Sequence, residues 1–365
     1  MDKKLETQVR EIFHLGADAK KKFGSTPYTL AFNPDITVNV NFSNQEELIL
    51  SFFKEDVQTY INAVKALDLD NRFEHSLKTL KNLSSQILKK ASHVESTLTN
   101  KLAAKQLKSW FIFIVSDVTF QSELMHRATL KPRGYPGDYL LLEKIYRNKP
   151  VSKSNLGKLF DNYFLMDPLA IAVRNRKDFM VSFLKQMVIL KNSNCPRFLN
   201  LASGSCRDIL EAFSDNFFSH NVEISCLDRD EEAVAFSRKT LAQLNKGLQL
   251  NFIVGNLFSF TRGLDPSDKY DLIYSIGLAD YLPDLALEEL IRFGLTHLKK
   301  GGKFVLAHKD YTRYLPLPEN WFCNWNFYDR DVEYILKMIE KRLGNRKPKI
   351  QRDPSGIMFY LIFTK

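Results

Sequence analysis

The stretch that decides the fold is RFLNLASGSCRDIL, residues 197–210. Its apolar run, 198–201, predicts a buried strand, and residues 207–218 have the spacing of a helix. The small residues between them let the backbone approach a ligand closely, and the start of the helix offers free N–H groups. This order of strand, small-residue turn and helix is typical of the first unit of a nucleotide-binding α/β sheet.

The alternation of strand and helix continues from this stretch to residue 307. Strands are predicted over 222–227, 250–254, 270–275 and 303–307, and helices over 231–244 and 284–298. Parallel strands need crossover helices, so we expect a mostly parallel sheet covered on both faces. After a helix over 331–343, strands over 348–352 and 357–365 flank a DPSG turn, which predicts an antiparallel hairpin. The expected fold class is α/β, a Rossmann-like sheet of seven strands, mostly parallel, with a C-terminal antiparallel hairpin.

The chain before residue 126 has a different character. Its apolar residues recur at helical spacing and predict helices over 46–67, 72–90 and 96–124, while weak alternation over 28–42 predicts one or two strands. Residues 126–150 hold a proline- and glycine-rich loop and a short helix over 139–147, and a longer helix is expected over 168–190. We therefore expect a mainly α-helical N-terminal domain over 1–125, a lid or cap segment with a connecting helix over 126–194, and the α/β domain over 195–365.

Polar or small residues follow the predicted strands in order, at the edge where sheets of this kind bind ligands. Asp228 follows the second strand, 24 residues after Gly204, where a carboxylate can accept hydrogen bonds from both hydroxyls of a ribose. Asn256 follows the third strand and offers a donor and an acceptor to an adenine edge. Each has a structural alternative: Gly204 and Asn256 as turn residues, and Asp228 as the N-cap of the next helix. The expected cofactor-binding residues are Ala202, Ser203, Gly204, Arg207, Asp228, Arg229, Asn256, Leu257, Ser275 and Gly277.

The expected catalytic residues are Tyr135, Asp280, Tyr281 and His308. Asp280 and Tyr281 follow the fourth strand, where folds of this kind place acceptor-side residues, and His308 lies at the end of the fifth. The structural alternatives are a helix N-cap for Asp280 and a simple hydrogen-bonding role for His308.

The proline–glycine corner before the α/β domain also contributes candidates. Arg133 and Tyr139 crowd into it beside Tyr135, so we expect them to belong to a lid over the site; the alternative is a purely structural corner. Arg174 and Arg176 lie two residues apart on a predicted helix and cannot share a face. We prefer Arg174 as the residue that points to the site.

Residues 195–365 resemble the class I S-adenosylmethionine-dependent methyltransferases in the small and polar residues that follow successive strands. The strings KYDLIYS and HLKKGGKFVLA and the C-terminal hairpin are similar to that fold. The loop of the family usually reads acidic-x-Gly-x-Gly-x-Gly; here the matching positions are Asn200, Ala202, Gly204 and Cys206, so only the central glycine is kept. The resemblance implies S-adenosylmethionine as the cofactor and methyl transfer as the activity.

A narrower resemblance covers residues 126–365 and concerns the extracellular factor 3-hydroxypalmitic acid methyl ester biosynthesis proteins. It is carried by KPRGYPGDY (131–139), AVRNR (172–176), DLIYSIGLADYL (271–282) and NWFCNWNFYDRD (320–331). The resemblance implies methylation of a 3-hydroxy fatty acid carboxylate, and hence a small-molecule, fatty acyl acceptor. The aromatic residues of the last string are either core residues or an acyl-chain pocket: Trp321, Trp325, Phe327 and Tyr328.

The chemistry of the acceptor distinguishes the functional hypotheses. A carboxylate is ionised at neutral pH and needs a cation or hydroxyls to position it, whereas an alcohol or amine needs a base such as His308 or Asp280. The alternatives are a methyltransferase acting on protein, nucleic acid or another metabolite, and a non-catalytic nucleoside-binding module, because the glycine loop is depleted.

Composition excludes several classes of protein and partner. Lys and Arg exceed Asp and Glu by 52 to 42, a net charge of +10, but the basic residues are dispersed and no RNA-binding motif is present, which disfavours nucleic acid. The four cysteines lack metal-site spacing, so reduced thiols and no metal are expected. The N-terminus does not resemble a secretory signal and the most apolar stretch, 110–115, is too short to cross a bilayer, so we expect a cytoplasmic protein with no membrane span. The sequence does not determine the oligomeric state.

Overall fold

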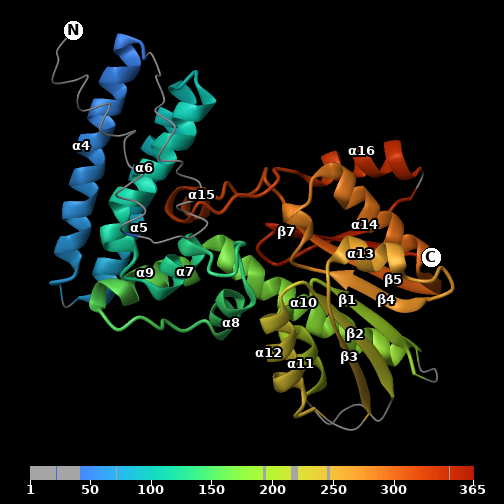
Figure 1. Cartoon of the computed structure of the whole chain (residues 1–365). Coiled ribbons are helices and arrows are strands. Elements are labelled where there is room, and N and C mark those ends of the chain that lie inside the picture. Colours follow the sequence, from blue (N-terminus) through green and yellow to red (C-terminus); the bar gives the residue numbers. More distant parts are fainter. Residues whose placement is uncertain are drawn as a thin grey trace. The chain divides into compact units, whose positions relative to one another are not determined.

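The computed structural model describes residues 22, 42–70, 72–191, 195–214, 221–244, 247–344 and 346–365. The chain forms two compact units (Figure 1). The first contains residues 1–167 and 316–326, and the second contains residues 168–315 and 327–365. This division differs from the expected one: the helix that starts at Pro168 belongs to the α/β unit, and residues 316–326 leave that unit to join the helical one.

The described residues of the first unit form helices joined by loops, with no strand among them. Its helices are α4 (Asn44–Leu67), α5 (Phe73–Thr97), α6 (Lys101–Thr119), α7 (Glu123–Leu130), α8 (Tyr139–Arg147), α9 (Asn155–Leu165) and α15 (Leu317–Cys323). α4 begins at a capping box, in which the Glu46 N–H donates to Ser43 Oγ and the Ser43 N–H donates to the Glu46 carboxylate. The strands predicted over 28–42 lie outside the described residues, except for Phe42.

The helix predicted over 96–124 is shorter in the structure, because α6 ends at Thr119 and a separate helix that we did not predict, α7, begins at Glu123. The reason is Ser122, whose hydroxyl accepts a hydrogen bond from the N–H of Met125 and starts a new helix. That hydroxyl also donates to Asp161 on α9, a helix that we did not predict. The other Asp161 oxygen accepts from the backbone N–H groups of Val151 and Ser152, so one buried carboxylate joins three segments.

α15 packs into the helical unit although it lies about 150 residues later in the sequence. Phe322 is fully buried, stacks on Tyr60 and Phe111, and meets Tyr163 edge-on. Trp321 is also fully buried and meets Phe111 edge-on. The reading of Trp321 as a core residue is therefore confirmed, and the core is that of the helical unit.

The second unit contains a seven-stranded sheet in the order β3-β2-β1-β4-β5-β7-β6. The first five strands in sequence pair in parallel, and β7 runs antiparallel to both β5 and β6. The predicted fold class is confirmed, hairpin included. The strands are β1 (Arg197–Leu201), β2 (Val222–Asp228), β3 (Leu248–Val254), β4 (Tyr270–Ser275), β5 (Leu298–Lys309), β6 (Lys349–Arg352) and β7 (Met358–Thr364).

Helices cover both faces of this sheet, and each face has its own apolar core (Figure 1). One core lies under α10 (Pro168–Lys191) and α11 (Arg207–Phe213), and the other lies under α14 (Asp284–Thr296) and α16 (Val332–Leu343). The remaining helices are α12 (Glu231–Leu241) and α13 (Leu257–Gly263), of which α13 was not predicted. Among the described residues, no helix has both the length and the apolar character needed to cross a membrane.

Substitution Phe322→Ala tests whether residues 316–326 stabilise the helical unit. We expect it to lower the free energy of unfolding of that unit by about 3–5 kcal/mol, because a fully buried ring is lost and a cavity remains. Phe52→Ala is the matched control, since Phe52 is 59% exposed on α4. Native-state hydrogen exchange of the α5 and α6 amides is the measurement. Equal protection in the two variants would contradict the packing role of α15.

Candidate active site

The loop after β1 has an unusual backbone. Ala202, Gly204 and Cys206 all have positive φ, of 55°, 56° and 50°. Only glycine adopts this left-handed conformation without strain; for other residues it costs about 1–2 kcal/mol. Alanine and cysteine therefore occupy two positions where the family's loop usually has glycine, yet the backbone conformation that glycine would favour is kept.

Asp228, at the end of β2, holds this loop in place. One of its carboxylate oxygens accepts from the Gly204 N–H at 2.7 Å, and the other accepts from the Asp230 N–H at 2.9 Å. Burial raises the pKa of the carboxyl, an effect that these two hydrogen bonds oppose. The N-cap of α12 is Asp230, whose side chain accepts from Glu232 and Ala233 N–H, so the alternative role of Asp228 as that cap is wrong. Each Asp228 oxygen keeps a lone pair that can accept from a ribose hydroxyl.

Asn256 caps α13 with its side-chain oxygen, which accepts from the N–H of Phe258 at 2.9 Å and of Ser259 at 3.2 Å. Its amide nitrogen is the part of the side chain that can donate to an adenine ring. Leu257, the first residue of α13, is half-buried. Arg207, which starts α11, is also half-buried, and Arg229 is exposed.

Arg176 on α10 reaches the segment that follows β4. A Cβ atom built on Gly277 would lie 3.5 Å from Arg176 Nη2, and Arg176 is only 6% exposed. Ser275, the last residue of β4, is fully buried. Three buried polar atoms near the ends of β1 and β4 lack a hydrogen-bond partner among the described residues: Arg176 Nε, Ser203 Oγ and Ser275 Oγ. We preferred Arg174 on this helix; it is partly buried, and burial lowers the pKa of its guanidinium.

Asp280 and His308 lie next to each other in the protein interior. Asp280 Oδ1 accepts from the backbone N–H of Lys309 at 2.9 Å and lies 3.2 Å from His308 Nδ1. His308 has no exposed surface, and burial lowers the pKa of its imidazole. On the other side of the ring, Nε2 lies 3.4 Å from Arg330 Nη1. Both candidate bases are thus bonded into the scaffold around the ends of β4 and β5.

Arg330 fixes the segment between β4 and α14. Its guanidinium is buried, forms an ion pair with Asp284 and donates to the backbone oxygens of Leu282 and Ala279. This arginine lies in the string NWFCNWNFYDRD, but its role could not be read from the sequence, because its partners lie about 50 residues away.

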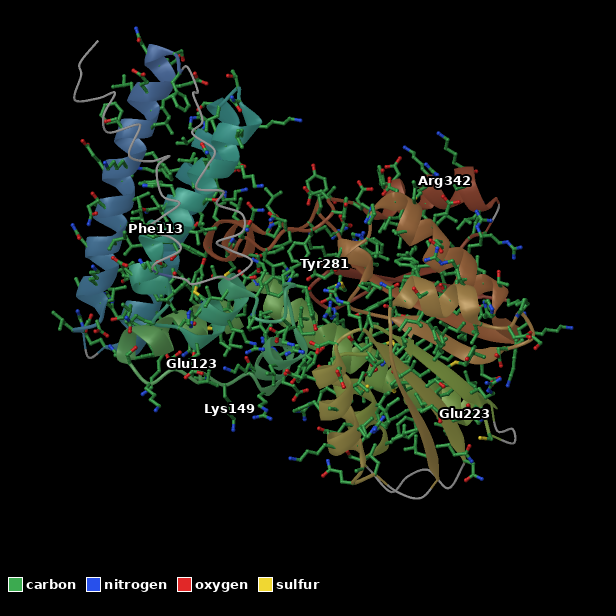
Figure 2. The ribbon with its side chains drawn as sticks, viewed as in Figure 1. Phe113, Glu123, Lys149, Glu223, Tyr281 and Arg342 are labelled. Atoms are coloured by element: carbon green, nitrogen blue, oxygen red, sulfur yellow. The ribbon has the colours of Figure 1, made fainter. Side chains whose placement is uncertain are left out.

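Tyr281 marks the carboxyl end of the parallel strands, and Glu223, at the start of β2, marks their amino end (Figure 2). The ring of Tyr281 packs against Phe327 at 5.6 Å. Phe327 in turn lies 4.6 Å from the ammonium of Lys309, the last residue of β5. Sequence reasoning did not select Lys309, although a lysine two residues after the predicted apolar strand 303–307 was a usable signal.

The candidates from the proline–glycine corner belong to the first unit. Arg133 and Tyr135 are half-buried there, and Tyr139 is buried as the first residue of α8. The corner is fixed by Asp138, which caps α8 and accepts from Arg127 Nε at 2.9 Å. A role of these residues in a lid stays a prediction.

The cysteines and the acidic residues do not form a metal site in the described part of the chain. No cluster of three or more His, Cys, Asp or Glu side chains is found there that could hold a metal ion. All four cysteines are free thiols, and the buried Cys226 is hydrogen-bonded to Cys206, which together with burial raises the pKa of Cys226 well above its ordinary value.

Comparisons with known proteins agree with this architecture. Residues 192–349 match the family model described as "Methyltransferase domain". A "possible exported protein" from Bordetella parapertussis has a similar solved structure, with a TM-score of 0.50 and 17% identity over 86% of this chain and 96% of that chain. Magnesium protoporphyrin IX methyltransferase from Synechocystis PCC 6803 with bound S-adenosylhomocysteine matches with a TM-score of 0.42 and 13% identity, over 61% of this chain and 93% of that chain. No curated protein matches.

The strand order and the antiparallel β7 define the second unit as a class I methyltransferase fold. With the family match over residues 192–349, the protein is an S-adenosylmethionine-dependent methyltransferase. The residues at the carboxyl edge fit this cofactor. The Asp228 carboxylate suits the ribose hydroxyls, and the unpartnered Ser203, Ser275 and Arg176 atoms suit the polar amino-acid end.

Asp228→Ala tests the cofactor site. Hydrogen bonds to a charged group contribute about 1.5–3 kcal/mol, so we expect the affinity for S-adenosylmethionine to fall by about 10- to 100-fold. Asp230→Ala is the matched control, because it removes the cap of α12 and lowers stability without removing an acceptor for the ribose. Calorimetric titration of both variants gives the comparison. An equal loss of affinity in the two would show that Asp228 acts only through folding.

Proposed function

We propose that this methyltransferase transfers a methyl group to the carboxylate of a small molecule, of the 3-hydroxy fatty acid type, and forms a methyl ester. The resemblance of residues 126–365 to the methyl ester biosynthesis proteins suggests the acyl group. The state of the candidate bases supports the carboxylate, and this is the observation on which the proposal rests.

Asp280 and His308 were the residues expected to remove a proton from an alcohol or amine acceptor. A general base must reach the proton that it abstracts. Both ring nitrogens of His308 have partners: Nδ1 lies 2.7 Å from the Lys309 carbonyl oxygen and Nε2 lies 3.4 Å from Arg330 Nη1. Asp280 accepts from the backbone N–H of Lys309. A carboxylate acceptor needs no base, since it is ionised at neutral pH. The arrangement therefore favours an acceptor that arrives as an anion.

S-adenosylmethionine, when bound, supplies an activated methyl group on a sulfonium. Transfer to a carboxylate oxygen forms one C–O bond and breaks one S–C bond; the electron pair of that bond stays on sulfur, and no proton is released. What the protein has to provide is alignment and exclusion of water. The anchored loop after β1 and the segment after β4, which Arg330 fixes, are the parts of this chain that supply rigid alignment.

The test uses purified full-length protein, methyl-labelled S-adenosylmethionine and a panel of 3-hydroxy fatty acids beside their primary amides. We expect label in the acids and none in the amides. Mild alkali should release the label as volatile methanol, because esters hydrolyse under conditions in which methyl ethers and N-methyl groups persist. Label confined to protein or nucleic acid in cell extracts, or label that resists alkali, would overturn the proposal.

The pH dependence of kcat gives an independent check. Because burial lowers the pKa of His308, its ring stays neutral as the pH falls toward the ordinary histidine value near 6.5, and its protonation would occur only at lower pH. The carboxylate acceptor is ionised throughout. We therefore expect kcat to be flat between about pH 6 and 8.5. A rise of about tenfold for each pH unit below a midpoint near 7 would instead indicate an essential base.

A further inference from the structure

Lys309 is the last residue of β5 and one of the most enclosed side chains in the protein. It has no exposed surface. Its backbone is fixed on both sides: the N–H donates to Asp280, and the strand pairs Lys309 with Met358 of β7. The position of its side chain is therefore set by the sheet.

The ammonium of Lys309 is buried and donates no hydrogen bond to any described residue. Its nearest acidic group is Asp329, whose Oδ1 lies 3.8 Å from Nζ; the Asp329 side chain is 60% exposed. The ring of Phe327 lies 4.6 Å from Nζ. A buried ammonium loses its hydration, and neither a ring face nor a long contact to a solvated carboxylate replaces three hydrogen bonds. Nζ can therefore still donate hydrogen bonds to a bound group.

The place of Lys309 in the fold indicates what that group is. It ends β5 at the edge of the sheet where the carboxyl end of β4 also lies, because the two strands are parallel neighbours. Phe327, beside the ammonium, packs on Tyr281 of the segment that follows β4. The Gly277 end of the same segment faces Arg176 and lies close to Ser275, and both of these residues contribute polar atoms that suit the cofactor. Lys309 therefore lies on the β5 side of this segment, away from the cofactor residues after β1 and β2.

We infer that the Lys309 ammonium binds the carboxylate of the methyl acceptor, with the rings of Phe327 and Tyr281 against its apolar part. This inference rests on the proposed function and identifies the residue that selects an acid over a neutral analogue. Nζ donates to one carboxylate oxygen and leaves the lone pairs of the other oxygen for the methyl group. A lysine suits this task because it binds as a point charge, whereas a bidentate arginine would engage both oxygens.

The experiment compares binding of octanoate and octanamide to the protein saturated with S-adenosylhomocysteine, by calorimetric titration. The two probes share a tail and differ in charge. We expect the wild type to prefer octanoate by at least about 30-fold, the lower range for a buried charge pair. Lys309→Met should abolish the preference and leave octanamide binding within about twofold, since Met keeps most of the side-chain volume.

Two further variants keep the result interpretable. Lys309→Arg retains the charge and should retain a preference for octanoate, which separates the role of charge from a failure to fold. Lys303→Met is the matched control, since the same change is made in the middle of the same strand, away from its carboxyl end, and it should behave as the wild type. Binding of S-adenosylhomocysteine by every variant reports that the fold is intact.

The outcomes are separable. The inference is overturned if the wild type binds octanoate no better than octanamide, if octanoate does not bind at millimolar concentration, or if Lys309→Met keeps the preference. The last result would also arise if Asp329 were the true partner of the ammonium. If instead the preference depends on Lys309 and yet no acid in the panel is methylated, the proposed function fails while the assignment of the anion site stands.

Discussion

The hydrogen bond between the Gly204 N–H and the Asp228 carboxylate is the interaction on which the site depends. It joins the loop after β1 to the end of β2, and the parallel pairing of those strands places the two ends at one edge. The loop carries non-glycine residues with positive φ at Ala202 and Cys206. Strain of this kind persists only where the surroundings over-determine the conformation. Asp228, the Ser203 N–H bond to Leu227 and the Ser237 bond to the Gly204 oxygen supply that constraint.

Buried polar atoms without partners gather at the same edge of the sheet. Arg176, Ser203, Ser275 and Lys309 each contribute one. Native proteins satisfy nearly all such atoms, because an unmade buried hydrogen bond costs about 1–3 kcal/mol. These atoms lie near the carboxyl ends of β1, β4 and β5. A polar cofactor and a charged methyl acceptor bound side by side would supply their hydrogen-bond partners. The buried carboxylate of Asp161 in the helical unit shows the opposite case, since both its oxygens are bonded within the protein.

Much of the α/β unit could be predicted from the sequence, because short local patterns of apolar, small and polar residues determine its strands and turns. Apolar runs bounded by small or polar residues gave six of the seven strands to within about two residues, and the DPSG turn gave the hairpin. The fifth strand was placed at 303–307 but extends from Leu298 to Lys309, since its first lysines and glycines lack a strand pattern. Leu298 pairs with Tyr270 of β4, and Gly301 and Gly302 form backbone hydrogen bonds with Lys365. In the helical unit the sequence analysis missed α7, α9 and α15 and extended α6 beyond its end at Thr119. Those errors arise where a cap or a distant aromatic contact, and not periodicity, decides the element.

The sequence by itself determined the fold class, the cofactor class and the order of residues along the carboxyl edge, because parallel strands bring successive strand ends together whatever the helices between them do. Only the tertiary structure decided what each residue does there. Asp280 and His308 follow their strands as expected, yet their neighbours from β5 and from Arg330 hold them inside the scaffold. The sequence analysis placed Arg176 second to Arg174 and did not select Lys309, whereas the structure buries both Arg176 and Lys309. The burial and the hydrogen-bond partners of a site residue depend on chain segments up to about 150 residues apart. A local sequence pattern therefore cannot predict them.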